Sequence, residues 1–249
     1  MRFLTNGVVE RLRAAVCASL LAAAAAVVAS GEEAVTPPAA PLETVAPEVV
    51  CLFENSVITY ARRPQMKTSQ FVFWRTRDEI RRQRIDGTEA NYWRRHPDGT
   101  VSFHRLLPEH KRVVDYNEGD LKALQSLQSW EDLATFAEVR DLIGRLERDG
   151  EAEVREIGRT AERYIGQVDG VDIEIHWLPE EQVPALFRRG FPARLVTLRL
   201  VELATPGEAQ WQRISDASFA RYDYADIGDF EDDPVFGYLH AEHEHAHGH

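Results

Sequence analysis

The chain has 249 residues, of which 44% are hydrophobic, and its 41 acidic residues outnumber its 29 basic ones to give a net charge of −12. This length and composition suit one domain with a hydrophobic core of its own. The negative charge argues against nucleic acid, and against an anionic membrane surface, as the main partner, because both would repel the protein.

Residues 1–30 have the three parts of a secretory signal peptide. A positively charged start precedes an alanine-rich apolar run over 14–29, and Val28-Ala29-Ser30 supplies the small-residue cleavage pattern. The alternative is a retained membrane anchor, but the run is short for a span, which normally needs about 18 or more apolar residues. We therefore predict an exported protein, periplasmic or secreted, that is not transmembrane after processing.

Residues 31–47 are rich in proline, alanine and glutamate and have no apolar period. We expect a flexible linker there, before a domain that spans 48–225. Cys51 is the one cysteine left after processing, which excludes an intrachain disulfide. Its apolar neighbours indicate the start of a strand and a buried thiol.

From 49 to 117 the pattern predicts short β-strands. Turn signals such as Asp86-Gly87 recur about every eight to twelve residues. The strand-length pieces between these signals are 67–76, 79–85, 89–95, 100–107 and 111–117. Because the connections are short, an antiparallel meander is the simplest topology.

Helices are predicted next. Residues 120–127 form a short candidate, and Ser129 is a suitable N-cap for a longer helix of about four turns, which Asp149-Gly150 would end. The apolar residues of this longer helix recur in steps of three and four. Its apolar stripe should therefore lie on the sheet.

Strand signals then return, with Asp169-Gly170 as a hairpin turn. The predicted pieces are 152–158, 161–168, 171–177, 184–189, 193–203 and 209–223. The whole is an α+β, mostly β fold: an antiparallel curled half-barrel of about 10–11 strands with a helix pair packed on its concave side. An acidic and then histidine-rich tail, 226–249, follows the domain.

Two stretches of this pattern resemble a known superfamily. They are RTAERYIGQVDGVDIEIHWLPEEQVPALFRR, residues 159–189, and the strand rhythm of residues 71–116. The positions that carry the resemblance are Gly166, Asp169-Gly170, Ile173, Trp177, Leu178-Pro179 and Val183-Pro184. Over roughly 50–225 the chain is similar to the LolA/LolB-like periplasmic lipoprotein-carrier superfamily. The resemblance implies a concave apolar cavity that holds a lipid or acyl chain under the helices, and it transfers no particular binding residue.

Six aromatic residues are the candidates for lining such a cavity. They are Phe71, Phe73, Trp74, Tyr92, Trp93 and Phe103. The alternative for each is an ordinary place in the core. Strand parity puts Phe71 and Phe73 on one face and Trp74 on the other, so both faces of that strand are expected to be covered.

Arginines are dense between 75 and 95, at positions 75, 77, 81, 82, 84, 94 and 95. A basic patch there would suit a lipid headgroup or an acidic partner. The reading we favour is cross-strand pairing with nearby carboxylates such as Glu79 and Asp86.

The tail HAEHEHAHGH carries five candidate metal ligands, namely His240, His243, His245, His247 and His249. Neutral imidazole binds Zn²⁺, Cu²⁺ and Ni²⁺, so we expect the tail to capture such ions, although the chain requires no cofactor. Residues 243–247 fit H-E-x-x-H, but no helix can be completed so close to the end, and a zinc protease is therefore excluded.

The sequence thus predicts an exported, non-enzymatic carrier of an apolar ligand, such as a lipid or a lipoprotein acyl chain, with a metal-binding tail. Its partners would be the ligand and a periplasmic or outer-membrane protein. The alternative is a periplasmic metal-binding or metal-delivery protein in which the tail is the functional site and the β-domain a scaffold. A hydrolase is the least favoured class, because no nucleophile–base set is apparent and the histidines at 96, 104, 110 and 176 suit structural or surface roles.

Overall fold

The structure, a computed structural model, describes residues 46–230, 233, 235 and 236. The predicted signal peptide, the linker up to residue 45 and the five tail histidines lie outside these residues. Everything described below belongs to one compact unit.

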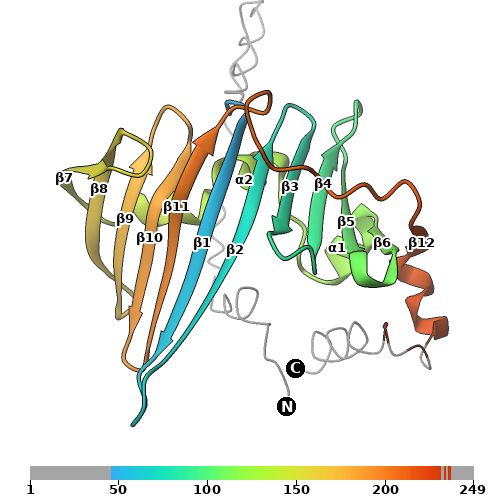
Figure 1. Ribbon diagram of the computed structural model, residues 1–249, viewed down its shortest axis with the longest axis horizontal. Coiled ribbons are helices and arrows are strands. Elements are labelled where there is room, and N and C mark those ends of the chain that lie inside the picture. The colour runs from blue at the N-terminus through green and yellow to red at the C-terminus, as the bar shows by residue number, and fades with distance from the viewer. Residues whose placement is uncertain (1–45, 231–232, 234, 237–249) are drawn as a thin grey trace, which may run out of the picture. The chain divides into compact units, whose positions relative to one another are not determined.

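Twelve strands form a single sheet (Figure 1). The first run is β1 (Val49–Thr59), β2 (Gln65–Arg75), β3 (Glu79–Arg84), β4 (Ala90–Arg95), β5 (Val101–Leu107) and β6 (Arg112–Tyr116). The second run is β7 (Glu147–Val154), β8 (Arg159–Val168), β9 (Val171–Leu178), β10 (Val183–Phe191), β11 (Arg194–Ala204) and β12 (Ala220–Asp223). Their order is β12-β6-β5-β4-β3-β2-β1-β11-β10-β9-β8-β7, so two antiparallel meanders meet where β1 pairs with β11.

The prediction of a mostly β, antiparallel curled sheet with helices is confirmed, with twelve strands in place of 10–11. The exception to antiparallel pairing is β12, which runs parallel to β6 at one edge. Much of the predicted strand 209–223 is instead an extended segment, 205–219, which crosses the sheet face opposite the helices and which we call the strap. The strap side chains pack onto an existing sheet face, so its backbone finds no strand partner until β12.

Three short helices cover the other face, which we call the helix face. They are α1 (Glu118–Ala123), α2 (Trp130–Thr135) and α3 (Ala137–Ile143), and 3₁₀ segments lie at η1 (Pro108–His110) and η2 (Tyr224–Phe230). Capping boxes at Asn117 and Ser129 start α1 and α2, so the N-cap predicted at Ser129 is confirmed.

The predicted four-turn helix is wrong, because the chain breaks it at Phe136. This residue takes a left-handed conformation with φ 50°, and its ring packs 4.9 Å from the ring centre of Phe73. Thr135 donates its hydroxyl to the carbonyl of Glu131 at 2.8 Å, a bond that bends helices. Burial of the Phe136 ring thus overrides the helical period.

Residues Asp149 and Gly150 do not end a helix either. Helix α3 stops at Ile143, and both residues lie inside β7, where the register with β8 shifts between Arg148 and Glu151. Gly150 has φ 82°, which fits a bulge that only glycine adopts freely. The turn signal therefore marked a strand irregularity.

The main core lies between the helix face and residues 130–136, which include α2. Its buried members come from eight strands and α2: Val49, Cys51, Phe53, Phe73, Ile80, Ala134, Val154, Ala161, Leu178, Val183, Ala185 and Leu200. The burial predicted for Cys51 is confirmed, and burial raises the pKa of its thiol to about 12. This cysteine is therefore an unreactive core residue.

Arg75 shows that the sheet curls toward the helices. Its buried guanidinium donates to the carbonyls of Pro47 at 2.8 Å, Gln182 at 3.2 Å, Ala134 of α2 and Glu181. Glu181 and Gln182 lie in the β9–β10 turn, directly before β10. Strands β1 and β11 separate β10 from β2, so β2 and β10 would lie about 14 Å apart in a flat sheet. One side chain spans this gap because the helix face is concave here.

Packing continues beyond the predicted boundary at 225. Ile227 in η2 and Phe236 are buried with Val114, Tyr116 and Leu121 in a second cluster. Asp233 accepts a bond from Arg112 at 2.6 Å and is committed to this packing. The start of the acidic segment is therefore part of the domain.

Candidate functional site

The six aromatic candidates do not line one surface. Phe71, Phe73 and Trp93 belong to the helix-face core, and Phe103 lies on the same face beside Tyr116, at a ring distance of 5.1 Å. Trp74 packs with Trp211 of the strap, and Tyr92 with Ile214 and Phe219 of the strap. The structure thus brings four of the six toward one side and places the other two under the strap.

The helix face of β2, β4 and β5 carries aromatic rings that the helices cover only in part. Phe71, Trp93 and Phe103 are only half-buried there, whereas Phe73, nearer to α2, is buried. Trp93 and Phe103 face each other across β4 and β5 with ring centres 5.0 Å apart. This surface offers apolar contact that the helices leave unfilled.

Next to these rings lies a polar row in a single register. Arg82 of β3 pairs with Asn91 of β4, which pairs with Arg105 of β5. The Oδ1 of Asn91 is buried without a hydrogen-bond partner among the described residues, while its amide nitrogen donates to Glu89 at 3.0 Å. Two arginines and one amide therefore lie on the helix face. Asn91 is two residues from Trp93 in β4, and Arg105 is two residues from Phe103 in β5.

Arg82 is the unusual member of this row. Its side chain is exposed to solvent, yet burial among the surrounding residues lowers the pKa of its guanidinium, an effect that Glu89 partly offsets. Its guanidinium carbon lies 4.8 Å from the ring centre of Phe71, and no carboxylate of the described chain forms an ion pair with it. The charge therefore lies beside an aromatic ring and remains in contact with solvent.

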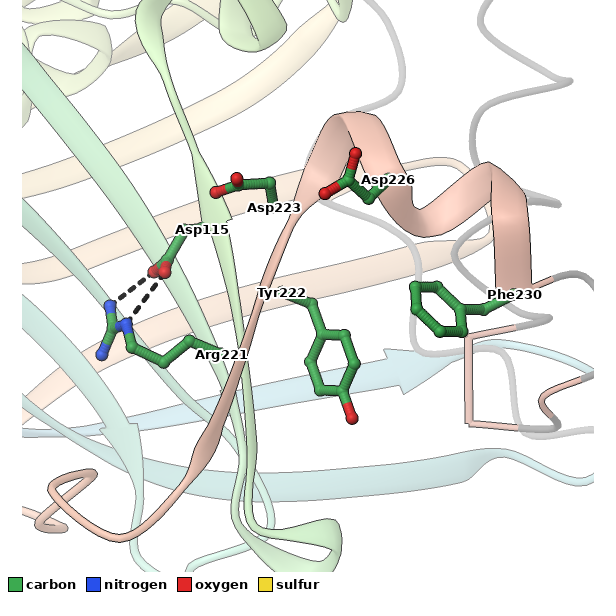
Figure 2. A pocket seen from close by; sticks show the side chains of 6 residues that line it. All are labelled: Asp115, Arg221, Tyr222, Asp223, Asp226 and Phe230. Carbon is green, nitrogen blue, oxygen red and sulfur yellow. Dashed lines mark hydrogen bonds and ion pairs between the residues drawn. The ribbon is translucent and has the colours of Figure 1, made fainter.

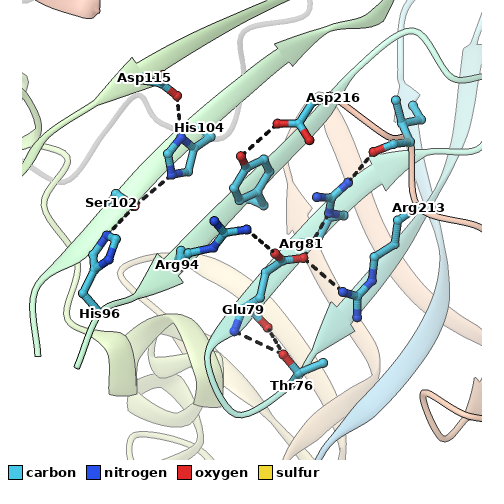
Figure 3. A network of polar contacts seen from close by, with 12 residues as sticks. Thr76, Glu79, Arg81, Arg94, His96, Ser102, His104, Asp115, Arg213 and Asp216 are labelled. Carbon is cyan, nitrogen blue, oxygen red and sulfur yellow. Dashed lines mark hydrogen bonds and ion pairs between the residues drawn. The ribbon is translucent and has the colours of Figure 1, made fainter. Parts of the chain in front are cut away.

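The opposite face of the same strands is closed by ion pairs (Figure 3). Glu79 accepts from Arg81 at 3.3 Å, from Arg94 at 3.2 Å and from Arg213 of the strap at 3.3 Å. Arg81 also donates to the carbonyl of Ile214 at 2.9 Å. The expectation of cross-strand pairing is thus confirmed for these arginines, and also for Arg84 with Asp86 at 2.6 Å.

A Ser–His–Asp chain lies further along this face (Figure 3). Ser102 Oγ is 2.8 Å from His104 Nε2, and His104 Nδ1 is 2.5 Å from Asp115. Both oxygens of Asp115 also accept from Arg221, at 2.5 and 2.9 Å, and burial lowers the pKa of His104. Arg221 therefore shares the carboxylate of Asp115, and burial disfavours the imidazolium of His104, which a triad aspartate would have to stabilise.

One pocket lies at the β6–β12 edge and has a volume of about 530 Å³ (Figure 2). Its lining is mainly polar: Asp115, Arg221, Tyr222, Asp223, Asp226 and Phe230. A second pocket of about 300 Å³ lies beside the β7–β8 and β9–β10 turns. Both are open to solvent, and neither is the enclosed apolar cavity that the resemblance implied.

Two features are absent from the described part of the chain. No group of three or more His, Cys, Asp or Glu side chains is placed there to hold a metal ion. Within the same residues, no helix has the length and apolar character to cross a bilayer. The tail histidines remain a prediction.

No protein-family model matches the chain, and no curated protein matches it. Among solved structures, PNGF-II matches with a TM-score of 0.37 and 10% identity over 74% of this chain, which spans about a third (32%) of the length of PNGF-II. MucB matches with a TM-score of 0.36 and 15% identity over 68% of this chain and 60% of its own.

A LolA superfamily protein from Nitrosomonas europaea is also similar, with a TM-score of 0.29 and 8% identity over 69% of this chain and 90% of its own. A member of the superfamily that the sequence resembles is thus among the similar structures. At these identities the likeness concerns the arrangement of the strands alone.

Sequence reasoning missed two features of the site. Arg82 was grouped with its neighbours, although parity separates it from Arg81 and Arg94 and places it beside Phe71 and Phe73. The cover provided by the strap had no local signal, because its contacts to β1–β4 join residues more than a hundred positions apart.

Proposed function

We propose that this protein is an exported carrier that binds an amphiphile with an anionic head, such as a fatty acid, on the helix face of β3–β5. One observation carries the proposal: Arg82 stands beside half-buried aromatic rings without an ion-pair partner in the described chain. A carboxylate would pair with Arg82, and an apolar chain would pack across Trp93 and Phe103.

The chemistry of the row supports a carboxylate or phosphate as the head group. A guanidinium binds such oxygens through two parallel bonds. The neighbouring Glu89 is held by Asn91 and disfavours a second anion close to it, so a singly charged head is preferred.

Direct binding of a fluorescent fatty acid tests this function, with the corresponding fatty alcohol as a neutral probe. Arg82→Met should weaken fatty-acid binding about tenfold or more, because a charge-assisted hydrogen bond contributes about 1.5–3 kcal/mol. The alcohol should bind both proteins equally. Arg94→Met, on the strap face of the adjacent strand, is the matched control and should bind as the wild type does.

Aromatic variants test the apolar half of the site. Trp93→Ala should weaken both probes, whereas Trp211→Ala, which removes an indole from the strap, should not. Equal binding by all four variants would place the ligand elsewhere. Absence of probe binding to the wild-type protein would refute the carrier function.

We also propose that the chain is not an enzyme. The Ser102–His104–Asp115 chain is the arrangement that most resembles a nucleophile set, and Arg221 withdraws its carboxylate from a catalytic role. A fluorophosphonate probe should therefore leave Ser102 unlabelled. Labelling that disappears in Ser102→Ala would overturn this part of the proposal.

Metal capture by the tail is a second candidate function, which rests on the five histidines of the last ten residues. Zinc titration by calorimetry on the full chain and on a chain ended after Tyr238 tests it. Binding by the full chain alone would support a metal site in the tail. If the shortened chain kept fatty-acid binding, the two functions would be separate.

A further inference from the structure

The charges of this acidic protein are segregated along the sequence. No Asp or Glu occurs from 55 to 77 or from 182 to 201, although 41 acidic residues are present in the chain. These two stretches contain nine arginines and lysines: Arg62, Arg63, Lys67, Arg75, Arg77, Arg188, Arg189, Arg194 and Arg199. The net charge of −12 therefore hides two basic stretches.

The sheet brings both stretches to one end. Thr59 pairs with Gln65 across the β1–β2 hairpin and with Arg194 of β11. The amide of Tyr60 donates to the carbonyl of Ala193 in the β10–β11 turn at 2.8 Å. The two hairpin turns therefore lie side by side, and we call residues 59–67 with 191–194 the basic tip.

The basic tip projects beyond the neighbouring strands. The pairing of β2 with β3 begins at Phe71 and Arg84, so residues 65–70 of β2 extend past the end of β3. Six residues of strand correspond to about 20 Å. Figure 1 shows the β1–β2 hairpin reaching well past β3 and β4.

The cations of the tip have no carboxylate partners in the described chain. Arg62, Arg63 and Lys67 form no ion pair there, and Arg194 contacts the ring of Phe191 at 5.0 Å. By contrast, Arg188 and Arg189, further back on β10, are paired with Glu174 and Glu138. The positive charge of the tip is therefore available to an external partner.

Two apolar side chains accompany these cations. Tyr60 is 51% exposed and Met66 is 68% exposed, which places both among the few exposed large hydrophobic residues of the described chain. A convex tip gives them no groove in which to be buried. Tyrosine is favoured at membrane–water interfaces, and arginine and lysine are attracted to anionic headgroups.

We propose that the basic tip docks onto an anionic phospholipid bilayer, with Tyr60 and Met66 entering the headgroup layer. The net negative charge does not prevent this, because the field of the remaining protein is screened over about 10 Å in ordinary salt and the tip stands about 20 Å ahead of β3. A flat surface fits a projecting tip, whereas an acidic protein would need a complementary concave site.

Sedimentation with vesicles tests the docking, using the full chain. Wild type should bind vesicles of phosphatidylglycerol with phosphatidylcholine, more weakly at high salt, and should bind phosphatidylcholine vesicles poorly. Arg62→Gln with Arg63→Gln should lower the partition coefficient about 30-fold, from about fivefold for each cation. Tyr60→Ser with Met66→Ser should lower it at every salt concentration.

The matched control is Arg77→Gln with Arg155→Gln, the same change of charge in turns at the opposite end of the sheet, and it should bind as wild type does. Equal loss in control and tip variants would overturn the proposal. Failure of wild type to bind either vesicle would also overturn it and would favour an acidic protein as the partner. Fatty-acid binding should persist in all tip variants, so failure here and failure of the carrier function are distinguishable.

Discussion

The two faces of β3–β5 carry the same residue type and use it in opposite ways. On the strap face, Arg81 and Arg94 converge on Glu79, and Arg81 is buried and donates to the strap. On the helix face, Arg82 meets an aromatic ring and solvent. Neighbouring arginines in one strand therefore have separate roles, because alternation sends them to different surroundings.

This difference separates arginines that stabilise the fold from one that contributes little to it. The paired arginines hold the strap against the sheet by side-chain bonds. These bonds take the place of the backbone pairing that the strap lacks. An exposed arginine without an ion pair contributes little to folding, and we propose that it contacts the ligand. Four substitutions, with expected effects from large to small, would test this contrast.

Arg75→Ala should be the most destabilising change. It leaves four carbonyl groups around a buried site without their donor and removes the link between β2, α2 and the β9–β10 turn. We expect the free energy of unfolding in urea to fall by about 3–5 kcal/mol. A loss below 1 kcal/mol would mean that the curl of the sheet does not depend on this residue.

Arg81→Met should cost less, about 1–3 kcal/mol, because it breaks one ion pair and one bond to the strap at Ile214 while keeping the apolar stem. The indole of Trp211 should become more exposed to solvent in the same variant, and its fluorescence emission should shift to longer wavelength. An unchanged tryptophan signal would show that the strap is held by its apolar contacts alone.

Arg82→Met should change stability by less than about 0.5 kcal/mol, because this guanidinium has no ion pair to lose within the described chain. Chemical unfolding of this variant and of Arg81→Met compares the two faces of the sheet directly. If both variants lost the same stability, the contrast between a structural and an available arginine would be wrong.

The smallest effect concerns pH. Burial lowers the pKa of His104 in the fold, and nearby Arg221 and Arg94 act in the same direction, while Asp115 opposes them. The unfolded chain therefore takes up this proton more readily, and stability should decrease as pH falls through about 6.5, the ordinary value. His104→Gln should flatten this decrease in unfolding curves between pH 7.5 and 5. An unchanged slope would assign the effect to other groups.

The sequence by itself determined the local elements of this protein. Alternating apolar residues and turn signals predicted β2 to β6 and β8 to β11 closely, and the N-cap at Ser129 predicted the start of α2, because these patterns depend on residues near one another. Burial of Cys51 followed from the same kind of pattern, as did the parity that separates Trp74 from Phe73.

Only the tertiary structure decided what covers each face. The break at Phe136 depends on packing against Phe53 and Phe73, and the strap depends on bonds to β3 that no local period records. The pairing of β1 with β11 creates both the concave helix face and the basic tip. These features join residues far apart in the chain, so their energies appear only when the sheet has formed.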